Sequence, residues 1–202
     1  MDWDERYSAA DGYLFGEQPN AFLARQKALI KPGMKILAVA DGEGRNGVWL
    51  AEQGAHVVST DYAASALEKA RTLAASRQVE LDLQQVDLGN WDWPEAAYDM
   101  VVAIFIQFAA PDERTAIFEG MKRALKPGGI LLLEGYRPEQ IGYGTGGPKA
   151  AENMYDEAML REAFSDFEIK TLSAYDAHIE EGKGHSGMSA LIDLIAVKPQ
   201  SK

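Results

Sequence analysis

The sequence contains no cysteine among its 202 residues. This excludes disulfide bonds, thiolate metal ligands and thiol nucleophiles. Its three histidines, His56, His178 and His185, are widely separated and do not form a histidine-rich metal motif. We therefore expect no bound metal. We interpret His56 and His178 as structural residues, and His185 as a surface or hydrogen-bonded turn residue rather than a general base.

Long apolar segments and a basic surface are absent as well. No apolar run approaches the roughly 20 residues that cross a membrane, and the charged start MDWDERY lacks the apolar stretch of a signal peptide. Asp and Glu outnumber Lys and Arg by 31 to 20, a net charge of -11 that repels nucleic-acid phosphates and anionic lipid. We expect a cytoplasmic protein without a membrane or nucleic-acid partner. The oligomeric state is left open.

Short apolar runs alternate with helical segments along most of the chain. The S-x-x-E pattern at Ser65 and Glu68 predicts a capping box at a helix start, and KPGG at residues 126–129 predicts the end of another helix. Strands separated by such helices form a mostly parallel sheet. The expected strands lie at residues 36–40, 56–60, 81–87, 100–106 and 130–133.

The last forty residues change in character. Runs at residues 167–179 and 186–197 flank a glycine-containing turn, which predicts a hairpin. The expected fold is α/β: a Rossmann-like, seven-stranded, mostly parallel sheet with helices on both faces and an antiparallel C-terminal hairpin strand. We expect one domain over residues 1–202, with residues 1–33 as an N-terminal capping segment and residues 137–155 as a mobile loop.

A glycine-rich loop follows the first expected strand. Gly42, Gly44 and Gly47 fit G-x-G-x-x-G, in which glycines allow a ligand close to the backbone at a helix N-terminus. Asp61 ends the second expected strand, where an acid binds ribose hydroxyls. The pattern indicates an adenosine-containing ligand. The alternative is that the glycines serve only helix–strand packing.

A third acid narrows the choice of ligand. Asp41, Asp61 and Asp87 each follow an expected parallel strand, so all three converge at the carboxyl edge of the sheet. Several carboxylates oppose a pyrophosphate but suit the sulfonium and ammonium groups of S-adenosylmethionine. The alternative for Asp87 is an ordinary solvated carboxylate at a strand end.

With these motifs the chain resembles the class I S-adenosylmethionine-dependent methyltransferases, in particular the small tellurite-resistance-like branch (methyltransferase types 11, 12 and 25). The resemblance covers nearly the whole chain. It implies a methyltransferase (EC 2.1.1.-) with S-adenosyl-L-methionine as cofactor, S-adenosyl-L-homocysteine as product and a small-molecule methyl acceptor as partner. The segments that carry it are residues 36–54, 57–71, 86–91, 98–108 and 125–136.

The resemblance also implies roles for single residues. Asp61 would hold the ribose hydroxyls, Tyr62 would lie beside the adenine, and Asp87 would accept from the adenine amino group. The sequence has Ala38 and Ala40 where the family usually has an acid and a glycine, which predicts weaker cofactor binding unless Asp41 substitutes. The implied cofactor-binding residues are Ala40, Asp41, Gly42, Gly44, Asn46, Asp61, Tyr62, Asp87, Leu88, Ile104 and Phe105.

Four aromatic residues are candidates for the acceptor side: Tyr13, Phe15, Tyr136 and Tyr143. Aromatic rings attract a sulfonium by cation–π interaction, although packing explains Tyr13 and Phe15 equally well. Arg137 is interpreted as a solvated strand-end residue rather than an anchor for an anionic acceptor. No catalytic residue is assigned, because a soft anionic acceptor needs no base.

Three functional hypotheses remain at this stage. The first is methyl transfer to a small molecule, with a chalcogen oxyanion or a thiol as candidate acceptors. The second is an NAD(P)-linked oxidoreductase, which rests on G-x-G-x-x-G and Asp61. The third is a nonenzymatic S-adenosylmethionine-binding protein, which the departures at Ala38 and Ala40 suggest.

Overall fold

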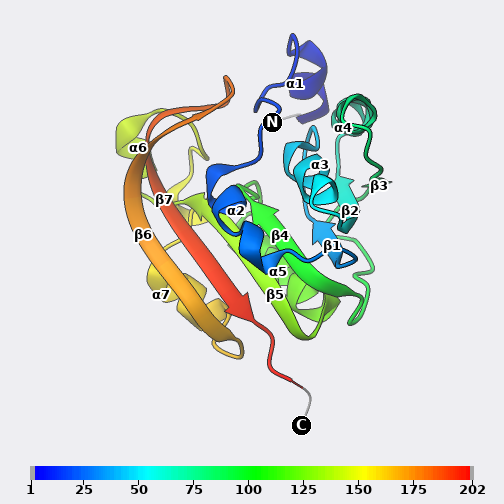
Figure 1. Ribbon diagram of the computed structural model, residues 1–202. Coiled ribbons are helices and arrows are strands. Elements are labelled where there is room, and N and C mark those ends of the chain that lie inside the picture. Colours follow the sequence, from blue (N-terminus) through cyan, green and yellow to red (C-terminus); the bar gives the residue numbers. More distant parts are fainter. Residues whose placement is uncertain (1–2, 201–202) are drawn as a thin grey trace.

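A computed structural model describes residues 3–200 and shows a single seven-stranded sheet (Figure 1). The strand order is β3-β2-β1-β4-β5-β7-β6. Strands β3, β2, β1, β4 and β5 pair in parallel, whereas β7 is antiparallel to both β5 and β6. This confirms the predicted mostly parallel sheet with an antiparallel hairpin. The strands are β1 Lys35–Ala38, β2 His56–Asp61, β3 Asp82–Gln85, β4 Tyr98–Ile104, β5 Leu125–Tyr136, β6 Glu168–Glu181 and β7 His185–Val197.

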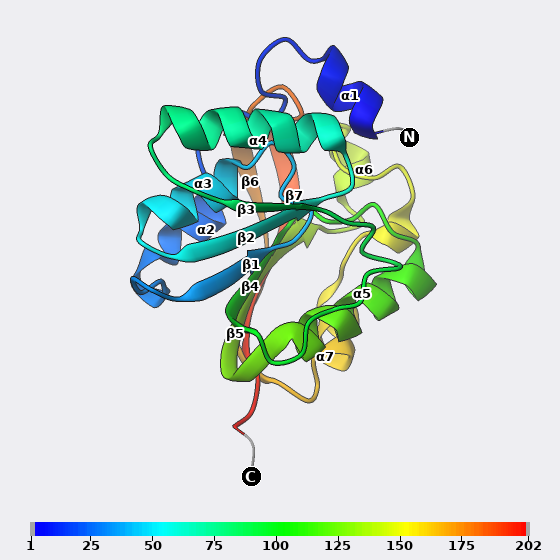
Figure 2. The same ribbon diagram turned by 90° about the vertical axis from the view of Figure 1, so that its right-hand side faces the viewer.

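Helices cover both faces of the sheet, as the sequence predicts (Figure 2). Side chains of α2 and α3 pack on one face, and side chains of α5 and α7 pack on the other. Among residues 3–200, no helix is long and apolar enough to cross a membrane. The α-helices are α1 Trp3–Ala9, α2 Ala21–Arg25, α3 Arg45–Glu52, α4 Ala64–Ser76, α5 Pro111–Ala124, α6 Gln140–Tyr143 and α7 Glu157–Ala163, and the 3₁₀ turns are η1 Lys27–Leu29 and η2 Ala151–Asn153.

The central strands are buried on both faces, which explains why they are almost continuously apolar in sequence. On β4, Val101 and Ala103 join the core beneath α5 and α7. Met100 and Val102 of the same strand join the core beneath α2 and α3. The strand ends at the upper edge of the sheet are therefore held between two packed layers.

One local prediction is wrong. Ser65 and Glu68 do not form a capping box, because α4 begins after Ala63 without a side-chain cap from its own sequence. Instead, the Ser65 amide donates to Asp4 Oδ1 at 2.8 Å and the Ser65 hydroxyl donates to the Asp4 carbonyl at 3.0 Å. The helix end predicted at KPGG is confirmed, because α5 ends at Ala124. The following strand, β5, begins at Leu125, earlier than the predicted residue 130.

The N-terminal segment packs over the upper edge of the sheet (Figure 1). Lys69 of α4 donates to the carbonyl oxygens of Tyr7, Ala10 and Gly12 at 2.7–3.1 Å. The tip of the β6–β7 hairpin reaches the same segment, where the Gly184 amide donates to the Leu14 carbonyl at 3.1 Å. Segments from both ends of the chain therefore meet above the strand ends.

Residues 137–155 form short turns beside β7. Gln140 is fully buried; its side-chain oxygen accepts from the Ala190 amide at 2.8 Å, and its Nε2 donates to Thr145 Oγ1 at 3.0 Å. These bonds fix the start of the segment to β7. The mobility of residues 137–155 stays a prediction.

Candidate functional site

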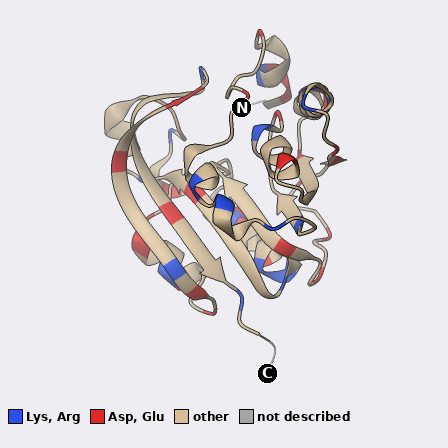
Figure 3. Ribbon diagram, viewed as in Figure 1, with Lys and Arg blue, Asp and Glu red and all other residues tan. Residues whose placement is uncertain are grey.

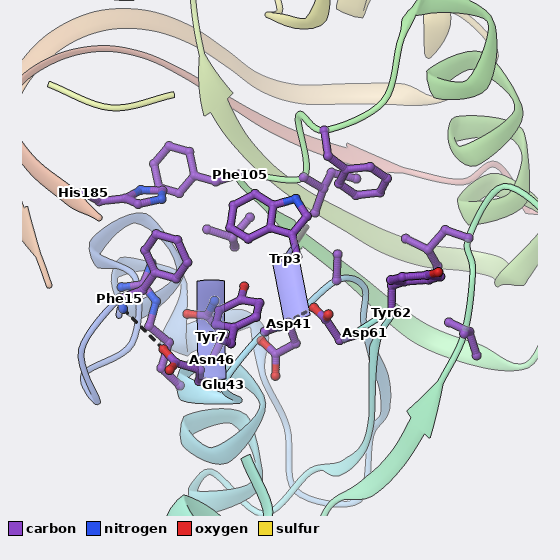
Figure 4. Close-up of a pocket in the computed structure, with 18 of the residues that line it drawn as sticks. Trp3, Tyr7, Phe15, Asp41, Glu43, Asn46, Asp61, Tyr62, Phe105 and His185 are labelled. Carbon is purple, nitrogen blue, oxygen red and sulfur yellow. Dashed lines mark hydrogen bonds between the residues drawn. The ribbon is translucent and has the colours of Figure 1, made fainter. Parts of the chain in front are cut away.

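A cavity of about 400 Å³ lies at the carboxyl ends of the parallel strands (Figure 4). Open α/β sheets bind ligands at this edge, where strand order reverses. The loop after β1, the end of β2, residues 86–88 after β3 and the end of β4 supply its floor. Trp3 and Tyr7 of α1, together with Phe15 and His185, complete its wall. Short segments that are far apart in the sequence therefore meet at one site.

The structure brings ten of the eleven expected cofactor residues to this cavity. The exception is Gly44, which has φ +84° and packs against α4. A Cβ on Gly44 would lie 2.6 Å from the Cβ of Ala70, so this glycine serves helix packing. The ten residues that line the cavity are Ala40, Asp41, Gly42, Asn46, Asp61, Tyr62, Asp87, Leu88, Ile104 and Phe105.

Asp61 is buried at the end of β2, and both of its carboxylate oxygens accept from backbone amides. Oδ2 accepts from Gly42 and Oδ1 from Ala63, each at 2.9 Å. Burial raises the pKa of Asp61, and the backbone hydrogen bonds oppose that rise. The carboxylate thus joins the glycine loop to the start of α4 while it faces the cavity.

Asp41 lies beside Asp61 at the start of the glycine loop (Figure 4). Its Oδ2 accepts from the Ser59 hydroxyl at 2.9 Å and from the Gly47 amide at 3.0 Å. Burial raises the pKa of Asp41 to about 7, and the negative charge of Asp61 adds to the rise. A cation that binds near these two carboxyl groups stabilises their ionised forms. The chemistry of this site therefore fits a sulfonium or ammonium ligand.

The two alanines that depart from the family pattern have different structural consequences. Ala38 is buried within β1, so no carboxylate reaches the cavity from that position. Ala40 lines the cavity with φ +46°, a left-handed conformation that favours glycine. An alanine costs about 1 kcal/mol there. The loop keeps its ligand-facing shape at that cost.

Tyr62 and Asp87 lie toward the open side of the cavity. The Tyr62 ring is 66% exposed, which leaves a face for a planar ligand to stack on. Asp87 accepts from the Gly89 amide at 3.1 Å and from Asn90 Nδ2 at 2.7 Å. Trp93 is buried nearby and donates from Nε1 to the Leu88 carbonyl at 3.2 Å.

Several residues that line the cavity are not among the expected site residues, and Trp3, Tyr7, Glu43 and His185 are four of them. Glu43 is buried; its Oε2 accepts from the Leu14 amide at 2.7 Å, and its Oε1 pairs with Lys69 at 3.0 Å. Glu43 could have been predicted to lie at the site, because it stands between Gly42 and Gly44 of the glycine-rich loop. No sequence pattern places Trp3 and Tyr7 of α1 at the site, because they do not follow a strand end.

His185 is buried rather than at the surface, so that part of the sequence interpretation is wrong. Its hydrogen-bonded role is right, because Nδ1 lies 3.1 Å from the Tyr136 hydroxyl. Burial lowers the pKa of His185 to about 3, and the positive charges of Arg45 and Arg6 lower it further. The imidazole is therefore neutral at physiological pH.

Of the four aromatic candidates for the acceptor side, two lie at the site and two do not. Phe15 lines the cavity, and Tyr136 is buried next to it, stacked on Phe105 at 4.6 Å between ring centroids. Tyr13 donates to the Lys69 carbonyl at 3.4 Å and packs beside α4. Tyr143 donates to Asp176 at 2.9 Å on the outer surface. Tyr13 and Tyr143 are therefore corrected to structural and surface residues, because their side chains point away from the cavity.

Arg137 also lies outside the cavity. Its Nε donates to the Leu191 carbonyl at 3.1 Å, and its guanidinium pairs with Asp176. These contacts attach Arg137 to β7 and β6 and give it a structural role. Within the described part of the chain, no group of three or more His, Asp or Glu residues is arranged to hold a metal ion.

Residues 36–129 match a family model described as a methyltransferase domain. An uncharacterised methyltransferase from Synechocystis is 31% identical over 126 residues, which are 61% of this chain and 57% of that protein. The matches span about a fifth to three fifths of the length of the curated relatives.

Solved structures of low sequence identity share the fold. TehB from Haemophilus influenzae has a TM-score of 0.72 at 18% identity, over 89% of this chain and 62% of that one. A structure from work on the conversion of a disulfide bond into a thioacetal group during echinomycin biosynthesis has a TM-score of 0.80 at 16% identity, over 99% of this chain and 91% of that one. The family's cofactor is S-adenosylmethionine. In the domain match over residues 36–129, in strand order and in fold, this chain is similar to the class I S-adenosylmethionine-dependent methyltransferases.

Proposed function

We propose that the protein transfers a methyl group from S-adenosylmethionine to a small-molecule acceptor. The observation that carries the proposal is the group of Asp41, Asp61 and Asp87 around one cavity in a methyltransferase domain. The pKa of Asp41 and that of Asp61 are both raised, so a cationic ligand relieves their repulsion and desolvation. A dinucleotide would instead bring a pyrophosphate toward these acids, which disfavours the NAD(P) alternative.

Each part of the cavity has a role in this proposal. Asp61 binds the ribose hydroxyls, the Tyr62 ring stacks on the adenine, and Asp87 accepts from the adenine amino group. Asp41 and the loop around it bind the methionine part. Ile104 and Phe105 lie beneath the reacting end. When bound, S-adenosylmethionine supplies a methyl group already activated by its sulfonium.

The chain's own contribution to the reaction is alignment and exclusion of water. The acceptor atom must lie in line with the methyl group, roughly 3 Å away. Trp3 and Tyr7 of α1 cover the cavity from above, where they exclude solvent. The resemblance to the tellurite-resistance-like branch suggests chalcogen oxyanions and thiols as first acceptors to test.

Calorimetric titration of the purified protein with S-adenosylmethionine, S-adenosylhomocysteine and NADH tests the proposal. We expect micromolar binding of the first two ligands and no heat from NADH. Binding of NADH alone would overturn the cofactor assignment. A radiolabelled methyl-transfer assay with selenite and thiol acceptors then separates an enzyme from a nonenzymatic binding protein.

A further inference from the structure

A second cavity of about 600 Å³ adjoins the first. The two cavities share a wall formed by Trp3, Phe15, Phe105, Phe108 and His185. An acceptor in the second cavity would therefore approach the reacting end of a cofactor in the first across these rings. Both volumes lie within the range of small-molecule sites.

The charges of the two cavities have opposite sign. The first contains five residues with carboxyl groups and one arginine. The second contains Arg6 and Lys149, and no Asp or Glu is among its described lining residues. This contrast occurs in a chain whose net charge is -11. A cation is therefore favoured in the first cavity and an anion in the second.

Aromatic rings form much of the wall of the second cavity. His185 meets Phe105 edge-on at 4.3 Å and Phe15 edge-on at 4.5 Å between centroids. The Trp3 ring lies 6.3 Å from the Phe15 ring (Figure 4), and the Arg6 guanidinium lies 4.8 Å from the Trp3 centroid. Such surfaces bind planar rings well and offer little to a small, strongly hydrated ion.

We propose that the second cavity binds the methyl acceptor and that this acceptor is a small planar aromatic compound with an anionic group. The inference rests on the methyltransferase function proposed above. The aromatic part of the acceptor lies among Phe15, Phe105 and Tyr136, and its anionic group faces Arg6 and Lys149. In the reaction a lone pair of the acceptor forms the new bond to the methyl carbon. The S–C bond pair returns to sulfur, which leaves neutral S-adenosylhomocysteine.

Naphthalene-2-carboxylate serves as a probe because it is planar, anionic and fluorescent. Its binding is measured in the presence of saturating S-adenosylhomocysteine and compared with that of the neutral isostere naphthalene-2-carboxamide. We expect the carboxylate to bind about tenfold more tightly, since two cationic residues face its charge. Equal binding of the two probes would overturn the proposed acceptor class.

Variants locate the probe. Lys149→Met should weaken carboxylate binding about two- to fivefold and leave carboxamide binding unchanged. Adding Arg6→Gln should bring the loss to about tenfold. Lys170→Met removes an exposed lysine of β6 outside both cavities and should change neither affinity. An equal loss from Lys170→Met would show that only the net charge of the protein matters, and would refute the site.

Two further measurements separate the proposals. If S-adenosylhomocysteine binds and naphthalene-2-carboxylate does not, the cofactor proposal stands and the acceptor class is wrong. Failure of S-adenosylhomocysteine to bind would refute the proposed function itself. Displacement of the probe by selenite at equal concentration would instead indicate an inorganic oxyanion as the acceptor.

Discussion

Asp41 and Asp61 are two neighbouring carboxyl groups that dominate the electrostatics of the cofactor cavity. Neither has a cationic partner within salt-bridge distance among the described residues, and both accept hydrogen bonds only from backbone amides and the Ser59 hydroxyl. Hydrogen bonds therefore hold the two carboxyl groups in position, but no positively charged side chain among the described residues forms an ion pair with them. Ligand binding and pH must therefore be coupled at this site.

The pKa of Asp41 predicts the sign of that coupling. Burial raises the pKa from 3.8 to about 7, so the folded protein keeps a proton that the unfolded chain has released. This group therefore lowers the free energy of unfolding as pH rises from about 4 to about 7. A cationic ligand favours ionised Asp41, so its binding releases the proton below pH 7.

We accordingly expect S-adenosylmethionine affinity to rise as pH increases from 5.5 to about 7, by at most about tenfold per pH unit. In Asp41→Asn this rise should be flattened, since the amide cannot ionise but still accepts from Ser59 and Gly47. Calorimetry of both proteins across this range is the measurement. Parallel pH profiles in the two proteins would contradict the assignment of the titration to Asp41.

Asp61→Asn tests the ribose assignment. Both carboxylate oxygens accept backbone hydrogen bonds, and an amide can reproduce only one of them. We expect binding of S-adenosylhomocysteine to weaken by about 1–3 kcal/mol. Asp82→Asn, at the exposed start of β3, is the matched control and should bind like the parent protein. Parent-like affinity of Asp61→Asn, with an unchanged circular dichroism spectrum, would refute the assignment.

At the scale of elements, α3 and α4 approach so closely that Gly44 has a packing role. Gly44→Ala should destabilise the fold by about 2–4 kcal/mol, through left-handed strain and overlap with Ala70. Two control glycines have no atom within 4 Å of a built Cβ: Gly12, with φ +73°, and Gly142, whose φ is not in the left-handed range. The free energy of unfolding in urea is measured for Gly44→Ala, Gly12→Ala and Gly142→Ala. Gly12→Ala shows the cost of left-handed strain alone, and any further loss in Gly44→Ala is due to overlap with Ala70. A Gly44→Ala loss no larger than that of Gly12→Ala would exclude the overlap.

Lys69 of α4 holds the N-terminal segment through three carbonyl oxygens, and it also contacts Glu43. Ser65 of α4 adds two hydrogen bonds to Asp4 of α1. Lys69→Met should loosen residues 3–16 from the cavity and weaken S-adenosylhomocysteine binding by about 1–3 kcal/mol. Hydrogen–deuterium exchange of this segment is the measurement, with Lys170→Met as control. Unchanged protection in Lys69→Met would show that aromatic packing and the Asp4–Ser65 hydrogen bonds suffice to hold this segment.

The elements also show what sequence could and could not predict. The central strands β1 and β4 are mostly apolar, so their positions and the convergence of Asp41, Asp61 and Asp87 could be predicted from the sequence pattern. The cap of α4 comes from Asp4, 61 residues earlier, and no local motif encodes it. Tyr13 and Tyr143 were misplaced because sequence spacing does not tell which way a loop side chain points.

At the scale of the whole molecule, distant segments complete one double cavity. Its acidic half is built from the parallel strands, whereas the basic half takes residues from α1, the segment after β5 and the hairpin tip. The acidic half lies mostly within residues 36–129, which match the methyltransferase domain. The sequence motifs describe this half. The other half lies largely outside residues 36–129, which explains why the acceptor could not be inferred from the sequence motifs.

The position of β6 at the edge of the sheet has a consequence for behaviour at high concentration. An edge strand presents unpaired amides and carbonyls to which another chain can add, and a 14-residue strand is a long template for such addition. Acids lie along β6 (Figure 3), and Glu168, Asp176 and Glu180 among them are exposed. A second copy would have to bring the same acids alongside. The acidity of this hairpin therefore acts against edge-to-edge aggregation.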